Sequence, residues 1–382
     1  MYKTRNLPNT RIDVADALRG IAVAGIIIYH SVEHFNIFTT EPISYTLACD
    51  DVVGRIMAWL LSGKMYGIFA LLFGLSFFIM NDNQQQKQRS FSLRFAWRMS
   101  LLWGFGIINL MLYDGDILMI YALLGLLIIP ISYLPSSVVW CIIGVLAIQP
   151  VEIYRLCSGW FLDGSEVWAL AGAICDAHMH GSFLENVSSN LQNGFFFNIL
   201  YFVYSGRMTQ ILCLFILGMQ LGRHRFFYDE HDHLHYWHIV LGASTVLVLA
   251  LSLVDFGALE LWLSPIYNLM ILCMITSAVV SAWYAFAGVR KALQHLCVFG
   301  RMSLTNYLLQ SIIGSFIFSG YGFACYRLVG TTYAVLIGLG MVIFQYLFCR
   351  YWFSNHSRGP LEGLWRKLTW MNFFTHSLFR EK

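Results

Sequence analysis

The sequence predicts an all-helical integral membrane protein, a bundle of about ten transmembrane helices with both termini in the cytoplasm. Three observations predict this fold class. Of the 382 residues, 58% are hydrophobic and only 12% are charged, whereas soluble domains carry about 25% charged residues. Apolar segments of about 17 to 25 residues recur along the chain, and each is long enough to cross the hydrocarbon core as a helix. Lys and Arg gather in alternate connections between these segments.

The expected spans start with a first helix that opens near Leu18 and shows no signal-peptide cleavage pattern, so we interpret it as retained. The longest connection, residues 157 to 205, is mixed in character, and we expect an extracytoplasmic loop with an interfacial or re-entrant helix in its aromatic run. The chain is then one transmembrane domain, 1 to 382, with five spans in residues 1 to 156 and the others in residues 206 to 382. The spans are expected at roughly 18–37, 54–80, 98–113, 117–134, 137–156, 206–222, 237–254, 263–287, 302–323 and 333–352.

The orientation follows from the placement of Lys and Arg, because positive charges near spans are retained in the cytoplasm. With the N-terminus inside, most of the basic residues fall in cytoplasmic segments. Those left outside are Arg55, Arg155 and Arg327. Those within or at the edge of a span, where each needs a partner or water, are Arg19, Lys64 and Arg207.

The first span carries the strongest pair of candidate site residues. Arg19 and His30 are about three helical turns, or roughly 16 Å, apart along a helix axis and project from nearly the same face. Arg19 then lies near the cytoplasmic boundary, where a cation can hold a phosphorylated donor, and His30 lies past mid-membrane, where an imidazole can act as a base or acyl carrier. The alternative is structural: Arg19 pairs with Asp16, and His30 is a buried, hydrogen-bonded histidine.

Further candidates lie on other spans. Lys64 lies inside the second span, where a lysine must face protein or a water-filled cavity, and Arg207 lies at the mouth of the sixth. Asp116 opens the fourth span, where a carboxylate suits the positive end of a helix, so capping is the alternative to substrate binding. In the ninth span, polar residues at helical spacing share a face that turns towards the bundle, either to bind substrate or to join helices. These residues are Ser303, Asn306, Tyr307 and Gln310.

No metal site is expected. Histidines alternate around His178 and again between His231 and His235, but such patterns in flexible loops are weak evidence for a metal. His34 follows His30 by one helical turn without a further ligand set. The nine cysteines show no metal-ligand spacing, and we interpret most of them as packing residues.

Several motifs spread along the chain occur together in a known family. The first half holds Asp16-x-x-Arg19-Gly20-x-Ala22, Lys64 with Phe69-Ala-Leu-Leu-Phe73-Gly74, and Gly115-Asp116-Ile-Leu with Tyr121-Ala. The second half holds Leu217-Gly218-Met219 with Leu221-Gly222, Gly300-Arg-Met-Ser-Leu-Thr305-Asn306-Tyr307-Leu-Leu-Gln310-Ser311, and Gly359-Pro360-Leu-Glu362-x-x-Trp365-Arg366. Together these motifs resemble the YeiB family, which carries a DUF418 domain in its second half, and the resemblance covers nearly the whole chain.

The first span also resembles that of the transmembrane acyltransferases, which include acyltransferase family 3 and the heparan-alpha-glucosaminide N-acetyltransferases. There a basic residue, ten intervening residues and a His form a signature, and Arg19 and His30 stand at that spacing. The resemblance implies that His30 is the catalytic or acyl-accepting residue and that Arg19 helps to bind acyl-CoA. The chain departs from many YeiB-like proteins at Asn109, where they carry a His.

The resemblance therefore implies a membrane-bound acyltransferase that moves an acyl group, with acetyl the first expectation, from cytoplasmic acyl-CoA to an envelope glycan or lipid. Arg19 and Lys64 would serve the acyl-CoA, which is the expected co-substrate. The alternatives are a transporter or flippase with a proton-coupled polar cavity, and a catalytically silent scaffold. The bilayer and the acceptor are the expected partners, without nucleic acid, and a bacterial inner membrane is the expected location. The acceptor side would be built by Asp116, Arg207, Asn306, Tyr307 and Gln310.

Overall fold

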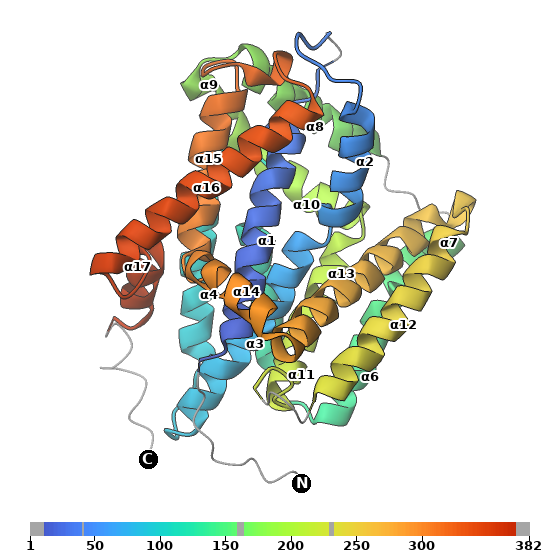
Figure 1. The fold of residues 1–382 in the computed structure, drawn as a ribbon, viewed down its shortest axis with the longest axis vertical. Helices are drawn as coiled ribbons and strands as arrows, with labels where there is room; N and C mark the ends of the chain where they lie inside the picture. Colours follow the sequence, from blue (N-terminus) through green and yellow to red (C-terminus); the bar gives the residue numbers. More distant parts are fainter. Residues whose placement is uncertain (1–10, 40–41, 159–163, 229–232, 372–382) are drawn as a thin grey trace.

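A computed structural model of the protein describes residues 11–39, 42–158, 164–228 and 233–371. In these ranges all regular secondary structure is helical, apart from one isolated bridge between Tyr45 and Val329. Figure 1 shows a bundle with its long axis vertical, in which α1 runs through the middle.

The helices of the first half are α1 (Asp13–Val32), α2 (Asp50–Leu61), α3 (Met65–Gln85), α4 (Ser92–Leu110), α5 (Leu118–Ile131), α6 (Ser136–Ala147) and α7 (Pro150–Ser158). The central part holds α8 (Gly164–His180), α9 (Phe183–Ser189), the π-helical turn η2 (Asn190–Gly194), α10 (Phe195–Tyr204) and α11 (Arg207–Arg223). The last part holds α12 (Leu234–Ser252), α13 (Glu260–Ala285), α14 (Ala287–Gly300), α15 (Ser303–Phe318), α16 (Thr331–Asn355) and α17 (Pro360–Thr369). Short 3-10 turns are η1 (His34–Asn36), η3 (Gly257–Leu259) and η4 (Cys325–Arg327).

Each of the ten predicted segments coincides with a helix or a pair of helices. Within the described residues, 5 helical segments are long and apolar enough to cross a membrane, or up to 7 if each of two bent pairs is one span. The bent pairs are α6 with α7, at 43°, and the α9–α10 segment with α11, at 78°. The predicted second span is α2 followed by α3, and Gly63 separates the two with a φ of +77°, a backbone conformation that favours glycine.

Two segments differ from the sequence prediction. Residues 157 to 205 were expected to form a loop, but the described part from residue 164 onwards is almost entirely helical. Its charged residues lower the hydropathy of α8, whereas the aromatic run forms α10 and bends by 78° into α11, so the pair is a broken span or a re-entrant segment. Helix α14 was not predicted, because Arg290, Lys291 and His295 give it too polar a face for a span.

The core of the bundle depends on close backbone contacts between α3 and α11. A Cβ atom at Gly74 would overlap the backbone carbonyl of Phe215, and one at Gly218 would overlap that of Leu71. The two glycines therefore allow the helices to approach as closely as small residues do in membrane helix pairs. Gly20 of α1 and Gly300 of α14 make a second such contact.

The last helix, α17, docks on the bundle through hydrogen bonds. The Glu362 carboxylate accepts hydrogen bonds from the backbone N–H groups of Leu304 (2.7 Å) and Thr305 (3.0 Å), and so caps the N-terminus of α15 from a distant part of the chain. The Trp365 indole donates a hydrogen bond to the Arg98 carbonyl of α4 at 3.2 Å, and the Arg98 guanidinium lies 3.4 Å from the ring centroid.

We predict that Gly218→Val disrupts the α3–α11 contact, because the new side chain would meet the Leu71 backbone, which cannot move aside. The expected loss is more than about 3 kcal/mol, beyond ordinary overpacking, and is measured as a fall in the thermal unfolding midpoint in detergent. The matched control is Gly242→Val on α12, where a Cβ meets nothing within 4 Å. Equal midpoints for both variants would contradict the proposed contact.

We predict that Glu362→Ala destabilises the protein by about 1 to 2 kcal/mol, because it leaves the first N–H groups of α15 without their acceptor. Glu362→Gln keeps one acceptor oxygen and should lose less. Both are compared by thermal unfolding with Glu166→Ala, which changes an exposed residue of α8. A Glu362→Ala variant as stable as this control would show that the cap contributes nothing.

Candidate functional site

Two cavities lie along α1, one towards each end. The Arg19 cavity, with a volume of about 1110 Å³, is lined by Arg19 and by residues of α3, α4, α15 and α17. The His30 cavity, of about 150 Å³, is lined by Tyr29, His30 and Glu33 together with residues of α3, α10 and α11. Tyr307 of α15 lines both cavities and so forms part of the wall between them. The structure thus places the two residues of the first-span pair in neighbouring cavities.

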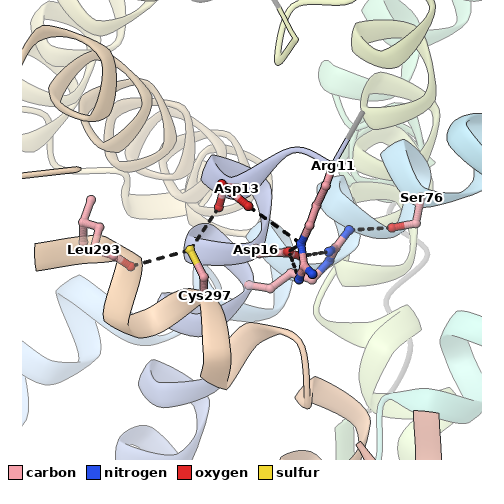
Figure 2. Close-up of polar contacts among 7 residues, drawn as sticks. Arg11, Asp13, Asp16, Ser76, Leu293 and Cys297 are labelled. Carbon is pink, nitrogen blue, oxygen red and sulfur yellow. Dashed lines mark hydrogen bonds and ion pairs between the residues drawn. The ribbon is translucent and has the colours of Figure 1, made fainter. Parts of the chain in front are cut away.

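Arg19 is held from both sides at the wall of its cavity. Its guanidinium forms an ion pair with Asp16, 2.7 Å away, and donates a hydrogen bond to the Ser76 hydroxyl at 2.7 Å. Arg11 approaches the other oxygen of Asp16 at 2.6 Å, as Figure 2 shows. The Asp16 carboxylate therefore pairs with both arginines. The pairing with Asp16 predicted by the structural alternative is present, and Arg19 lines the cavity as well.

The Arg19 cavity is strongly basic. Among its described lining residues, the acidic ones are Asp16 and Glu362. The cationic ones include Arg19, Lys87, Arg89, Arg98, Arg301 and Arg366. Such a wall attracts and holds anions, phosphates above all. Burial raises the pKa of Glu362, whereas the hydrogen bonds from Thr305 oppose that rise.

His30 lies in the second cavity among aromatic rings. Its ring centroid is 4.8 Å from that of Tyr113 and 5.8 Å from that of Phe35, and Gln310 lies beside the imidazole. Within the described residues, the buried Nδ1 atom has no hydrogen-bond partner. His30 is therefore held by aromatic packing and by its neighbour Gln310, and its Nδ1 atom is buried away from the cavity.

The end of α1 beyond His30 is unwound. His34, Phe35 and Asn36 have φ angles of 48°, 54° and 64°, a left-handed conformation uncommon for residues other than glycine. The His34 Nε2 atom lies 3.0 Å from the Val329 carbonyl, so this ring turns away from His30. The described part of the chain holds no group of three or more His, Cys, Asp or Glu side chains placed to hold a metal ion.

Arg207 lines the His30 cavity at the start of α11. Its guanidinium lies 5.5 Å from the ring centroid of Tyr66 and 4.9 Å from that of Tyr201. The sequence indicated Arg207 but not Tyr201, because the aromatic run that contains it was interpreted as interfacial. The 78° bend between α10 and α11 turns this residue towards the cavity, and that bend has no clear signal in the sequence.

Four other predicted site residues lie behind the cavity walls. The Lys64 ammonium group donates to the Ala58 carbonyl at 3.4 Å. Asp116 accepts hydrogen bonds from the Met119 N–H (3.0 Å) and from Asn109 (2.9 Å), so it caps α5 and ties it to α4. Asn306 donates to the Phe299 carbonyl at 3.2 Å, and Gln310 is fully buried. None of these four side chains is among the residues that line either cavity.

Sequence reasoning missed a buried ion pair near the bend. Glu152 and Arg155 of α7 are 0% and 1% exposed and are 2.8 Å apart, and Arg155 also donates to the Tyr204 carbonyl at 2.9 Å. This pair fixes the end of α10 just before Gly206, which has a φ of +69°. The spacing of three residues was the available signal, but the distribution of Lys and Arg assigned Arg155 to the outer side as an unpaired charge.

Comparison with known proteins finds a family of unknown function and relatives that are named only as uncharacterised proteins. Residues 221–372 match the family described as "Protein of unknown function (DUF418)". The chain is 26% identical over 402 residues to "Uncharacterized protein YxaH" of Bacillus subtilis (strain 168), and the alignment covers 96% of this chain and 96% of YxaH. It is 24% identical over 401 residues to "Uncharacterized protein YeiB" of Escherichia coli (strain K12), covering 93% of this chain and 95% of YeiB. No solved structure matches. The chain thus carries a DUF418 domain in its second half and is homologous to YxaH and YeiB along nearly its whole length.

Proposed function

We propose that the protein is a membrane-bound acyltransferase, which moves an acyl group, with acetyl the first expectation, from cytoplasmic acyl-CoA to a hydroxyl or amine of an envelope glycan or lipid. One observation supports this proposal above the others. Arg19 and His30 line two cavities that share Tyr307 as a wall, so a donor in one and an acceptor in the other would meet near mid-bundle.

The Arg19 cavity has the properties that acyl-CoA requires. Its volume of about 1110 Å³ accommodates a large cofactor, and its basic lining suits the phosphates of CoA. At its inner end, Phe69, Phe73 and Tyr121 offer apolar surface to an acyl chain. We assign this cavity to the cytoplasmic side of an inner membrane, with both termini on that side and about ten helices crossing the bilayer.

His30 is assigned the role of general base or acyl relay. As a base, the imidazole takes the proton from an acceptor hydroxyl in the His30 cavity while that oxygen attacks the thioester carbonyl. The C–S bond then breaks, and the CoA sulfur leaves as a thiolate that takes up a proton. Arg19, fixed by Asp16 and Ser76, binds the donor, and Tyr307 positions the reacting groups between the cavities.

The residues behind the walls are assigned supporting roles. Asp116 and Asn306 hold α5 and α15 in place, so Tyr307 keeps its position between the cavities. The Tyr307 hydroxyl also accepts a hydrogen bond from the Ile117 N–H at 3.3 Å, next to the Asp116 cap. Gln310 sets the environment of His30, and Lys64 adds positive charge beside the His30 cavity.

A transporter or flippase is the second candidate. The two cavities lie towards opposite ends of the bundle and meet at one side chain. An occluded transport path would have the same arrangement. Transport would proceed without thioester cleavage and would depend on a gradient, so the assay below separates the two candidates.

We predict that purified protein releases CoA from acetyl-CoA in the presence of an envelope-glycan extract, and that His30→Ala reduces the rate by at least about 100-fold. Arg19→Ala should mainly raise the KM for acetyl-CoA, because it removes a donor contact. The controls are His238→Ala and Arg55→Ala, which change exposed residues of α12 and α2. Turnover that survives His30→Ala in full would exclude the enzyme, whereas gradient-driven solute uptake without CoA release would establish the transporter.

We predict that Tyr307→Leu uncouples thioester cleavage from transfer, because the smaller side chain opens the wall between the cavities to water. CoA release without acceptor should rise relative to acylated product, by about tenfold in the ratio. Tyr307→Phe keeps the ring and should stay coupled. The ratio is measured by thiol titration and by mass spectrometry of the product. An unchanged ratio in Tyr307→Leu would show that this side chain does not separate the cavities.

A further inference from the structure

The guanidinium of Arg207 lacks an acidic partner in contact. It donates no hydrogen bond to, and forms no ion pair with, any residue in the part of the chain that the structure describes. Its neighbours are the ring faces of Tyr66 and Tyr201. These faces attract a cation, but they do not accept conventional hydrogen bonds from the five N–H groups of the guanidinium. A cation held inside a membrane protein without hydrogen-bond acceptors is costly, and such residues mark binding sites.

Glu33 lies near Arg207 but does not serve as its hydrogen-bond acceptor. Its carboxylate is near enough to Arg207 for an electrostatic interaction and lies beside the Tyr29 side chain, but it forms no ion pair with Arg207 in the described residues. Both Glu33 and Arg207 line the His30 cavity. The cavity therefore contains both a carboxylate that can accept hydrogen bonds and a guanidinium whose N–H groups lack acceptors.

The chain fixes Arg207 in this place. It is the first residue of α11, directly after the left-handed Gly206 and the sharp turn from α10. A Cβ atom at Gly206 would press against the Glu152 carboxylate, so the turn is packed against the buried Glu152–Arg155 pair. Since the positive end of the α11 dipole also lies here, the same end of the cavity carries two features that favour an anion.

The remaining lining suits a small ring. Tyr29, Tyr66, Tyr113, Trp168 and Tyr201 supply aromatic surface, which packs against the apolar faces of sugar rings. The volume of about 150 Å³ leaves room for a group the size of one sugar rather than a long chain.

We propose that the His30 cavity binds a sugar-sized group that carries an oxyanion, a carboxylate or a phosphate, with Arg207 as its bidentate partner. Glu33 accepts a hydrogen bond from a hydroxyl or amine of the same group. This inference deepens the proposed function: the acyl acceptor is an anionic glycan or glycolipid head group. It rests on the proposed function in taking the bound group to be the acyl acceptor.

The test is a binding measurement that needs no turnover. Isothermal titration of the full-length protein in nanodiscs compares glucose, glucuronate and glucose 6-phosphate, three ligands that share one ring. At least one of the two anionic sugars should bind about tenfold or more tightly than glucose, and the stronger of the two identifies carboxylate or phosphate as the natural group. Arg207→Gln should abolish this preference, and Arg207→Lys should keep part of it, because it restores charge without the planar fork.

Arg55→Gln serves as the control, since it removes a positive charge from an exposed position. Thermal unfolding of each variant establishes that it is folded. If Arg207→Gln does not fold, Arg207→Lys is compared with the original protein instead. Any of three results would overturn the inference. The protein binds all three sugars equally, it binds none of the three, or a folded Arg207 variant binds the anionic sugar as tightly as the original protein does. Anion binding without CoA release would refute the acyltransferase and leave the anion site in place.

Discussion

Polar groups inside this bundle must find partners within the protein, because lipid supplies none, and this constraint shapes the rest of the structure. Arg19 is held by Asp16 and Ser76, Arg155 by Glu152 and two backbone carbonyls, and Asp116 by Asn109 and the start of α5. Each set ties two or more helices together. The Nδ1 atom of His30 is one of several buried side-chain atoms without a hydrogen-bond partner in the described residues, and Arg207 of the same cavity packs against tyrosine rings.

The two halves of the chain build the site jointly. The first half contributes α1 and α3, which carry Arg19, His30 and Ser76, and the DUF418 domain contributes α15 and α17. Glu362 of α17 caps α15 and also lines the Arg19 cavity, so the motif near the C-terminus fixes the helix that carries Tyr307. The family match over residues 221–372 thus describes half of a shared site, not a separable unit.

Much of the fold could be predicted from the sequence, because the length and hydropathy of a segment decide whether it forms an apolar helix. Helix pairing could not be predicted, since it depends on contacts such as Gly74 and Gly218 that bring distant backbones together. For the site, the spacing of Arg19 and His30 identified one face of one helix. The assignment of Asp116 and Asn306 to supporting positions, and the part played by Tyr201, depend on helix bends and caps that a hydropathy profile does not contain.

The shared wall at Tyr307 has a consequence for how the two cavities communicate. One side chain bounds both spaces, so a ligand that moves the ring in one cavity changes the shape of the other. Thermodynamic linkage then requires the effect to be reciprocal: if a ligand in the Arg19 cavity tightens binding in the His30 cavity, the second ligand tightens the first by the same factor. Any coupling between ligands in the two cavities would therefore pass through Tyr307, the side chain that both linings share.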